Sequence, residues 1–135
     1  MIVRLAVESD IASCLAIQAS HKDQTFSAQD FRNSISDPNA ILLVAESGDG
    51  GVAGFMAGFV VPTRYEEALI HSTMVNKLLE RKGIGLALVR FFADFAFRER
   101  SVKVIYAEVE DGPDEFYEKC GFRKVHEWHS MRLLP

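Results

Sequence analysis

The stretch ERKGIGLALVRFFADF, residues 80–95, places two glycines directly before a long amphipathic helix. Apolar residues recur at helical spacing after the glycines, which predicts that one helix face packs on a sheet. The first turn of a helix has backbone N–H groups without an intrahelical partner, and the helix dipole adds partial positive charge there. Gly83 and Gly85 would let a ligand approach this backbone closely. The stretch alone therefore predicts a site for an anion such as phosphate.

The composition indicates one compact domain over residues 1–135. The chain is 48% hydrophobic, which is enough for one core, and its net charge of −4 comes from interspersed acidic and basic residues. Without a basic block, we expect no nucleic-acid partner. No apolar run approaches the roughly 20 residues that span a bilayer, and the start MIVRLAVESD lacks a signal-peptide core. We therefore expect a cytoplasmic protein and no membrane partner.

The cysteines and histidines form no pattern of metal ligands. Cys14 and Cys120 are far apart in sequence, and two cysteines in a cytosolic protein are more often reduced than disulfide-bonded. His126 and His129 have no third ligand nearby, whereas structural zinc takes four Cys or His ligands. We expect no metal.

Before the glycines, the sequence predicts a strand, two helices and three strands. Residues 2–6 form the first strand, and Ser9 precedes a helix. Ser27 and Asp30 form a capping box for a second helix, which Pro38 stops, and we expect residues 20–26 to be a mobile connection. An antiparallel meander follows, with strands over residues 41–45, 52–61 and 68–75.

After the central helix, we expect a strand over residues 102–109 and a short helix over residues 114–120. Gly121 occupies the position that a left-handed helix cap prefers. Residues 122–126 and 128–134 are predicted as two final strands. The fold class is α/β in the broad sense, an α+β mixed sheet that is mostly antiparallel and flanked by helices.

Two motifs carry a resemblance to a known family. The glycine segment and FYEKCGF, residues 116–122, resemble the GCN5-related N-acetyltransferase (GNAT) family over essentially the whole chain. The resemblance implies the acyl-CoA N-acyltransferase fold, with strands that splay at the CoA site. It also implies that acetyl-CoA is the cosubstrate, with its pyrophosphate on the loop and its pantetheine arm on the preceding strand. The cofactor-binding residues that it implies are Met74, Val75, Arg81, Lys82, Gly83, Ile84, Gly85 and Leu86.

The chain departs from the family pattern at two positions. Glu80 stands where relatives carry Gln or Arg, and its charge would repel a phosphate if the side chain pointed inward. Arg81 and Lys82 still place cations beside the glycines. Upstream of the second motif, Glu110 stands where many members have Asn. The rival dinucleotide-binding fingerprint fails, because Leu88 occupies its third glycine position.

The resemblance implies candidate catalytic residues. Tyr117 matches a family tyrosine that donates a proton to the departing CoA thiolate. Glu108 matches a glutamate that acts as a base in some relatives, and His71 on the third meander strand is the other candidate base. Each has a plainer interpretation, because a tyrosine can be a core residue and a strand Glu or His can simply face solvent.

The resemblance implies an acetyl-CoA-dependent N-acetyltransferase in which an amine acceptor attacks the thioester directly in a ternary complex. Alternatives are a non-catalytic acyl-CoA-binding or sensing module and a structural domain with an empty loop. The expected acceptor is a small-molecule or peptide amine. A homodimer is a further possibility, because exposed final strands in this architecture often pair. Acidic residues near the acceptor mouth would favour a cationic amine; these are Glu66, Glu67, Glu108, Glu110 and Asp111.

Overall fold

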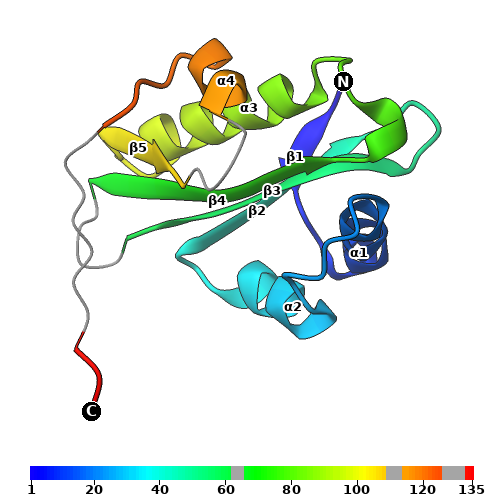
Figure 1. Ribbon diagram of the computed structural model, residues 1–135, viewed down its shortest axis with the longest axis horizontal. Coiled ribbons are helices and arrows are strands. Elements are labelled where there is room, and N and C mark those ends of the chain that lie inside the picture. The colour runs from blue at the N-terminus through cyan, green and yellow to red at the C-terminus, as the bar shows by residue number, and fades with distance from the viewer. Residues whose placement is uncertain (62–65, 109–113, 126–132) are drawn as a thin grey trace.

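The computed structural model describes residues 1–61, 66–108, 114–125 and 133–135. Within these residues the strands form one open sheet in the order β1-β2-β3-β4-β5, with α3 and α4 on one face and α1 and α2 on the other (Figure 1). The strands are β1 (Val3–Leu5), β2 (Ala40–Glu46), β3 (Val52–Val60), β4 (Glu67–Val75) and β5 (Val104–Ala107). The helices are α1 (Ile11–Ser20), α2 (Ala28–Ser36), α3 (Ile84–Glu99) and α4 (Asp114–Lys119), with short 3-10 turns η1 (Glu8–Asp10) and η2 (Lys77–Leu79).

The sheet is mixed and mostly antiparallel, as the sequence predicts. The pairs from β1 to β4 are antiparallel, and β4 pairs with β5 in parallel. Parallel neighbours need a crossover connection, which α3 provides. The predicted central elements are present, with ends that shift by one or two residues.

The sheet is buried on both faces, which explains why its central strands are almost wholly apolar. Side chains of β2 alternate between two cores, with Ile41 and Leu43 toward α3 and with Leu42 and Val44 toward α1 and α2. On β3, Gly58 lets α3 pack closely. A Cβ at this position would lie 2.7 Å from the ring of Phe92. The close approach fixes α3 against the strands that lead to its N-terminus.

Local signals place the smaller helices. Ser27 Oγ accepts a hydrogen bond from Asp30 N, and the Asp30 side chain accepts one from Ser27 N, which confirms the capping box of α2. After α4, Gly121 has φ of 99°, the left-handed conformation expected of the cap.

Two expectations about the connections are wrong. Residues 122–125 form no strand, and most of the final predicted strand lies outside the described residues. The connection between α1 and α2 is anchored rather than mobile. The buried side chain of Gln18 donates to Phe26 O at 2.9 Å and accepts from Phe26 N at 3.0 Å, and Ser20 Oγ accepts from Lys77 N. Paired buried hydrogen bonds of this kind hold a loop in one position.

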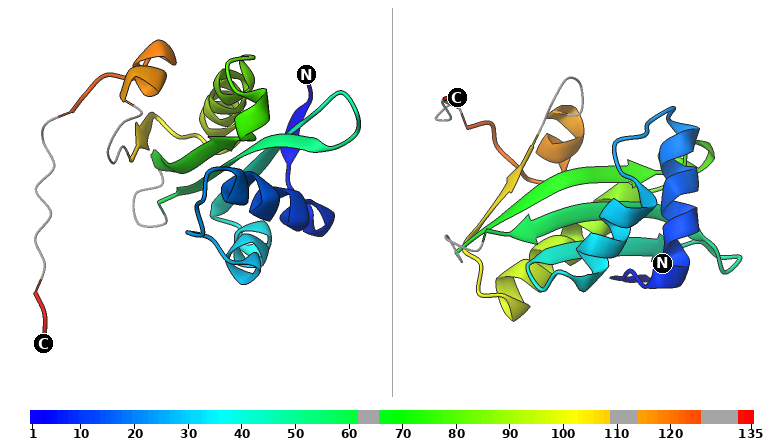
Figure 2. Two further views of the ribbon diagram at one scale, coloured as in Figure 1. Left: turned by 45° about the vertical axis from the view of Figure 1, so that its right-hand side comes forward. Right: turned by 90° about the horizontal axis from the view of Figure 1, so that it is seen from below.

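The pairing between β4 and β5 ends halfway along β4, where the two strands diverge. Their pairing runs from Glu67 with Val104 to Ile70 with Ala107, and Glu108 N then donates to Ile70 O. Within the described residues, β4 continues to Val75 with no strand on its outer side, and Figure 2 shows the two strands diverging toward α4. The parting opens the sheet next to the α3 N-terminus.

Candidate functional site

The loop before α3 presents backbone N–H groups to a cleft. Arg81 and Gly83 both have positive φ, at 64° and 81°, and the left-handed Gly83 is the N-cap of α3. No side chain in the described part of the chain caps this helix end, and the first helical bond runs from Ala87 N to Gly83 O. The N–H groups of Ile84, Gly85 and Leu86 therefore remain available, as an anion-binding helix start requires.

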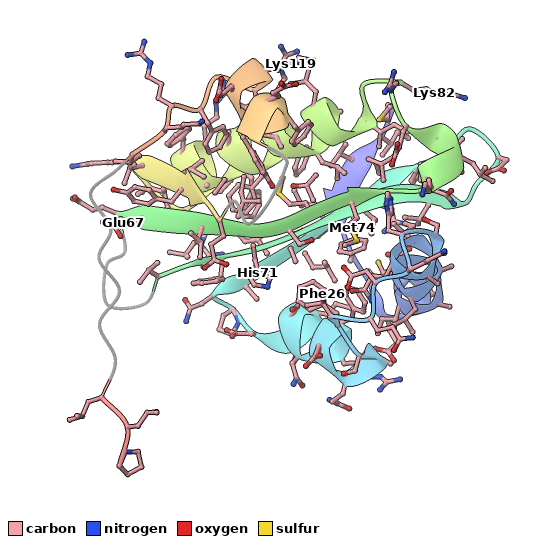
Figure 3. The ribbon with its side chains drawn as sticks, viewed as in Figure 1. Phe26, Glu67, His71, Met74, Lys82 and Lys119 are labelled. Atoms are coloured by element: carbon pink, nitrogen blue, oxygen red, sulfur yellow. The ribbon has the colours of Figure 1, made fainter. Side chains whose placement is uncertain are left out.

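A cavity of about 800 Å³, here called the glycine-loop cleft, runs along this helix end. Its walls are residues 73–75 of β4, residues 79–81 and 83–86, Phe116 and Lys119 of α4 with Cys120 just after it, and His21 and Asp23. It brings together all but one of the residues predicted to bind the cofactor. Lys82 instead lines a separate cavity beside the hairpin that joins β2 and β3. Figure 3 shows Lys82 on the loop and Lys119 on α4.

The open edge of β4 supplies polar backbone groups to the cleft. Asn76 N donates to Ala53 O on the β3 side, and backbone groups alternate in direction along an antiparallel strand. The N–H and C=O groups of Val75 and Thr73 therefore point away from β3, into the gap beside β5. The side chain of Met74 packs toward α1 and α2, while that of Val75 packs toward α3.

His21 reaches this open edge from the α1 end. Its Nε2 lies 2.6 Å from Val75 O, and only a protonated ring nitrogen can donate to a carbonyl, so Nε2 carries hydrogen. Glu80 Oε1 lies 3.6 Å from the same nitrogen. Glu80 also lines the glycine-loop cleft, which places its carboxylate beside the helix end.

Gly85 has a packing role as well as an exposed backbone. A Cβ there would lie 3.0 Å from ring atoms of Phe116, so the α4 ring rests directly on the first turn of α3. This contact positions α4, and with it the neighbouring Tyr117.

A second cavity of about 470 Å³, here called the β4–β5 cavity, adjoins the cleft. Residues 71–74, Glu108, Phe116 and Tyr117 line it, together with Asp23, Thr25 and Phe26 from the connection after α1. The two cavities share Asp23, Thr73, Met74 and Phe116. All three candidate catalytic residues, His71, Glu108 and Tyr117, line the second cavity.

Tyr117 lines the β4–β5 cavity and bonds to Thr73, one of the residues that the two cavities share. It is 5% exposed, and its hydroxyl is 3.2 Å from Thr73 Oγ1, a residue that lines both cavities. Burial raises the pKa of Tyr117, although the Thr73 hydrogen bond lowers it in part. The phenol therefore keeps its proton at neutral pH and can donate it.

His71 and Glu108 form a hydrogen-bonded couple. Nδ1 of His71 lies 3.0 Å from Glu108 Oε2. An ionised carboxylate can only accept, so Nδ1 carries the proton and Nε2 of a neutral ring is left as a base. His71 is the extra residue of a β-bulge, because Ser72 pairs with Ala57 and Ile70 with Gly58. The ring of Phe26 packs edge-on against that of His71, at 5.4 Å between centroids.

The prediction that five acidic residues lie near the acceptor mouth is only partly correct. Glu66 pairs with Lys103, and Glu67 lies at the far end of β4 from Met74, away from His71 (Figure 3). Neither lines the β4–β5 cavity, whereas Glu108 does, and Glu110 and Asp111 lie outside the described residues. The sequence reasoning missed Asp23, which faces both cavities. It also missed Thr73, whose polar side chain on an apolar strand was the available signal.

No group of three or more His, Cys, Asp or Glu side chains among the described residues is arranged to hold a metal ion. No helix in the described ranges is long and apolar enough to cross a membrane. Cys14 and Cys120 are both free thiols, as expected.

Solved structures share the fold at low sequence identity. A tetramutant protein from Bacillus halodurans has a TM-score of 0.81 with 18% identity, over 100% of both chains. An aminoglycoside 6'-N-acetyltransferase from Acinetobacter haemolyticus has a TM-score of 0.79 with 16% identity, over 98% of this chain and 99% of that one. Glucosamine-6-phosphate N-acetyltransferase from Arabidopsis thaliana has a TM-score of 0.73 with 17% identity, over 97% of each chain.

The family assignment comes from the sequence itself. No curated protein sequence matches the chain significantly. The model of the acetyltransferase (GNAT) family matches residues 6–122, which is most of the chain. Members of this family generally use acetyl-CoA, and the cleft at the α3 N-terminus has the backbone donors that a pyrophosphate needs. The chain therefore belongs to the acetyltransferase (GNAT) family and is an N-acetyltransferase with the acyl-CoA N-acyltransferase fold.

Proposed function

We propose that this protein transfers the acetyl group of acetyl-CoA to a small-molecule amine by direct attack in a ternary complex. The observation that supports it is the junction of the two cavities at Thr73, whose hydroxyl lies 3.2 Å from that of Tyr117. One cavity leads to the helix end that suits a pyrophosphate, and the other is lined by the His71–Glu108 couple. Two substrates entering from opposite sides would meet at the tyrosine hydroxyl.

In the proposed complex, the cosubstrate extends along the open edge of β4. The pyrophosphate would lie at the N–H groups of residues 84–86, with Arg81 and Lys119 as nearby cations. The N–H and C=O groups of Thr73 and Val75 that point away from β3 would hydrogen-bond the C=O and N–H groups of the pantetheine amides. His21 already bonds to Val75 O, but a carbonyl has a second lone pair to offer.

The amine would enter the β4–β5 cavity and lose its proton to His71 Nε2, which Glu108 keeps in the required tautomer. The amine nitrogen then bonds to the carbonyl carbon, and the carbon–sulfur bond breaks. Sulfur keeps the electron pair and takes the proton of the Tyr117 hydroxyl. The attacking nitrogen releases its second proton as the amide forms, and this proton neutralises the Tyr117 phenolate. Orientation of the two substrates supplies much of the acceleration, because it replaces a bimolecular encounter.

The direct test is turnover of the purified protein with acetyl-CoA and a panel of primary amines, read out as free thiol and as acetylated product by mass spectrometry. Acetylated amine supports the proposal. Calorimetric binding of acetyl-CoA with no transfer to any amine would instead identify a sensing module. Absence of binding would identify a structural domain.

Tyr117→Phe should lower kcat by roughly 10- to 1000-fold with unchanged acetyl-CoA affinity, because it removes only the acidic hydroxyl. The ring contacts with Phe116 and Phe122 remain, so the variant should fold. The matched control is Tyr106→Phe, since Tyr106 lines neither cavity. An unchanged kcat in the Tyr117 variant would remove this residue from the mechanism.

His71→Ala should lower kcat more than Glu108→Gln does. Loss of the base costs roughly 100-fold or more, whereas a glutamine oxygen can still accept from His71 Nδ1. Steady-state kinetics of both variants and of the double variant measure this order. The reverse order would make Glu108 the base and His71 its positioning residue.

Glu80→Gln should tighten acetyl-CoA roughly 3- to 10-fold, because it removes an anion from the cleft at the proposed pyrophosphate site. Calorimetric titration measures the Kd. Glu99→Gln at the other end of α3 is the matched control and should leave the Kd unchanged. Equal affinities of the wild type and the Glu80 variant would place the phosphates elsewhere.

A further inference from the structure

The β4–β5 cavity is bordered by negative charge. Among the described residues that line it, Asp23 and Glu108 are the acidic side chains, and no lysine or arginine accompanies them. Glu108 is bonded to His71, the proposed base, so its charge is tied to the reacting end of the cavity. Asp23 comes from the connection after α1, on a different element, and has no part in the transfer step.

The carboxylate of Asp23 is held in place by its own turn. Oδ1 accepts from Thr25 N at 2.9 Å and from Thr25 Oγ1 at 2.6 Å. These bonds, with that from the Thr25 hydroxyl the strongest, lower the pKa of Asp23, so the group is ionised at neutral pH. Both hydrogen bonds from Thr25 use Oδ1, and the Gln24 backbone N–H contributes further to the lowered pKa of Asp23. Oδ2 takes no part in the Thr25 bonds.

The turn is fixed relative to the base as well. Gln18 anchors the backbone of Phe26, and the Phe26 ring packs on Phe31, Phe55 and His71. Asp23 is thus connected to His71 through the Thr25 turn and the anchored Phe26, whose ring contacts the imidazole. A carboxylate positioned in advance in this way binds a cation without the cost of ordering a loop.

The size and walls of the cavity limit what can occupy it. A volume of about 470 Å³ suits a small molecule. Phe26 and Phe116 offer apolar surface to a hydrocarbon chain, while the carboxylates would repel an acceptor that carries its own carboxylate.

We propose that the preferred acceptor is a short diamine, with the reacting amine at His71 Nε2 and a second ammonium group at Asp23 Oδ2. The inference rests on the proposed acetyl transfer and adds Asp23 as the residue that selects the acceptor. The methylene chain between the two nitrogens lies along the aromatic wall. Only one amine is acetylated; the other stays protonated and paired with Asp23 throughout.

The test compares kcat/KM for 1,4-diaminobutane, 1-aminobutane and 4-aminobutanoate. The diamine should have a kcat/KM roughly 10-fold above that of the monoamine, because its second ammonium group makes a charge-assisted hydrogen bond. The zwitterion should have the lowest kcat/KM, because its carboxylate is repelled by the carboxylates of the cavity. Asp23→Asn should lower kcat/KM for the diamine roughly 10-fold, mainly through KM. It should lower kcat/KM for 1-aminobutane much less than for the diamine, because the monoamine has no second ammonium group to pair with Asp23 and asparagine can keep the Thr25 turn.

Asp37→Asn is the matched control, because Asp37 Oδ1 accepts from Asn39 N in a similar turn away from the β4–β5 cavity. This variant should leave kcat/KM unchanged for both the diamine and the monoamine. Thermal unfolding and acetyl-CoA affinity of the Asp23 variant verify its fold.

The outcomes separate the two proposals. The diamine inference is overturned if amines are acetylated but the wild type does not prefer the diamine. It is also overturned if Asp23→Asn lowers kcat/KM equally for the diamine and the monoamine. In both cases the acetyl transfer stands. If the wild type acetylates no amine at all, the proposed function fails and the inference fails with it.

Discussion

The site depends on the point at which β5 leaves β4. Among the described residues, the bond from Glu108 N to Ile70 O is the last between the two strands, and beyond it no described strand pairs with the outward backbone groups of Thr73 and Val75. Unpaired strand groups next to an apolar core are costly unless something hydrogen-bonds them. His21 satisfies one of them. A substrate with regularly spaced amides could satisfy others, which is why we propose the open edge of the sheet as the binding surface.

The same divergence of β4 and β5 lets side chains from the helix layers on both faces of the sheet reach one site. Phe116 rests on Gly85, which places Tyr117 over the gap from the α3 side. The anchored connection after α1 brings Asp23 and Phe26 to it from the opposite side. The bulge at His71 turns that side chain toward the end of β5. A continuous β4–β5 pairing would separate these groups into two unconnected faces.

Features encoded by neighbouring residues could be predicted from the sequence. Apolar runs bounded by turn residues predicted the central strands, Ser27 with Asp30 predicted the start of α2, and the glycines predicted the start of α3. Contacts between distant residues could not be predicted in this way. Nothing local shows that Glu108 would bond His71, that Thr73 would bond Tyr117, or that Lys82 would lie outside the cleft that Lys119 lines. The connection over residues 20–26 looked mobile because its anchor is a glutamine of the preceding helix.

Amide hydrogen exchange with and without saturating acetyl-CoA tests the central claim most directly, because it reports on single backbone N–H groups. The account predicts slower exchange at Thr73 and Val75 on the open edge of β4 and at Ile84, Gly85 and Leu86 in the first turn of α3. Binding of acetyl-CoA that leaves all of these amides unprotected would contradict it.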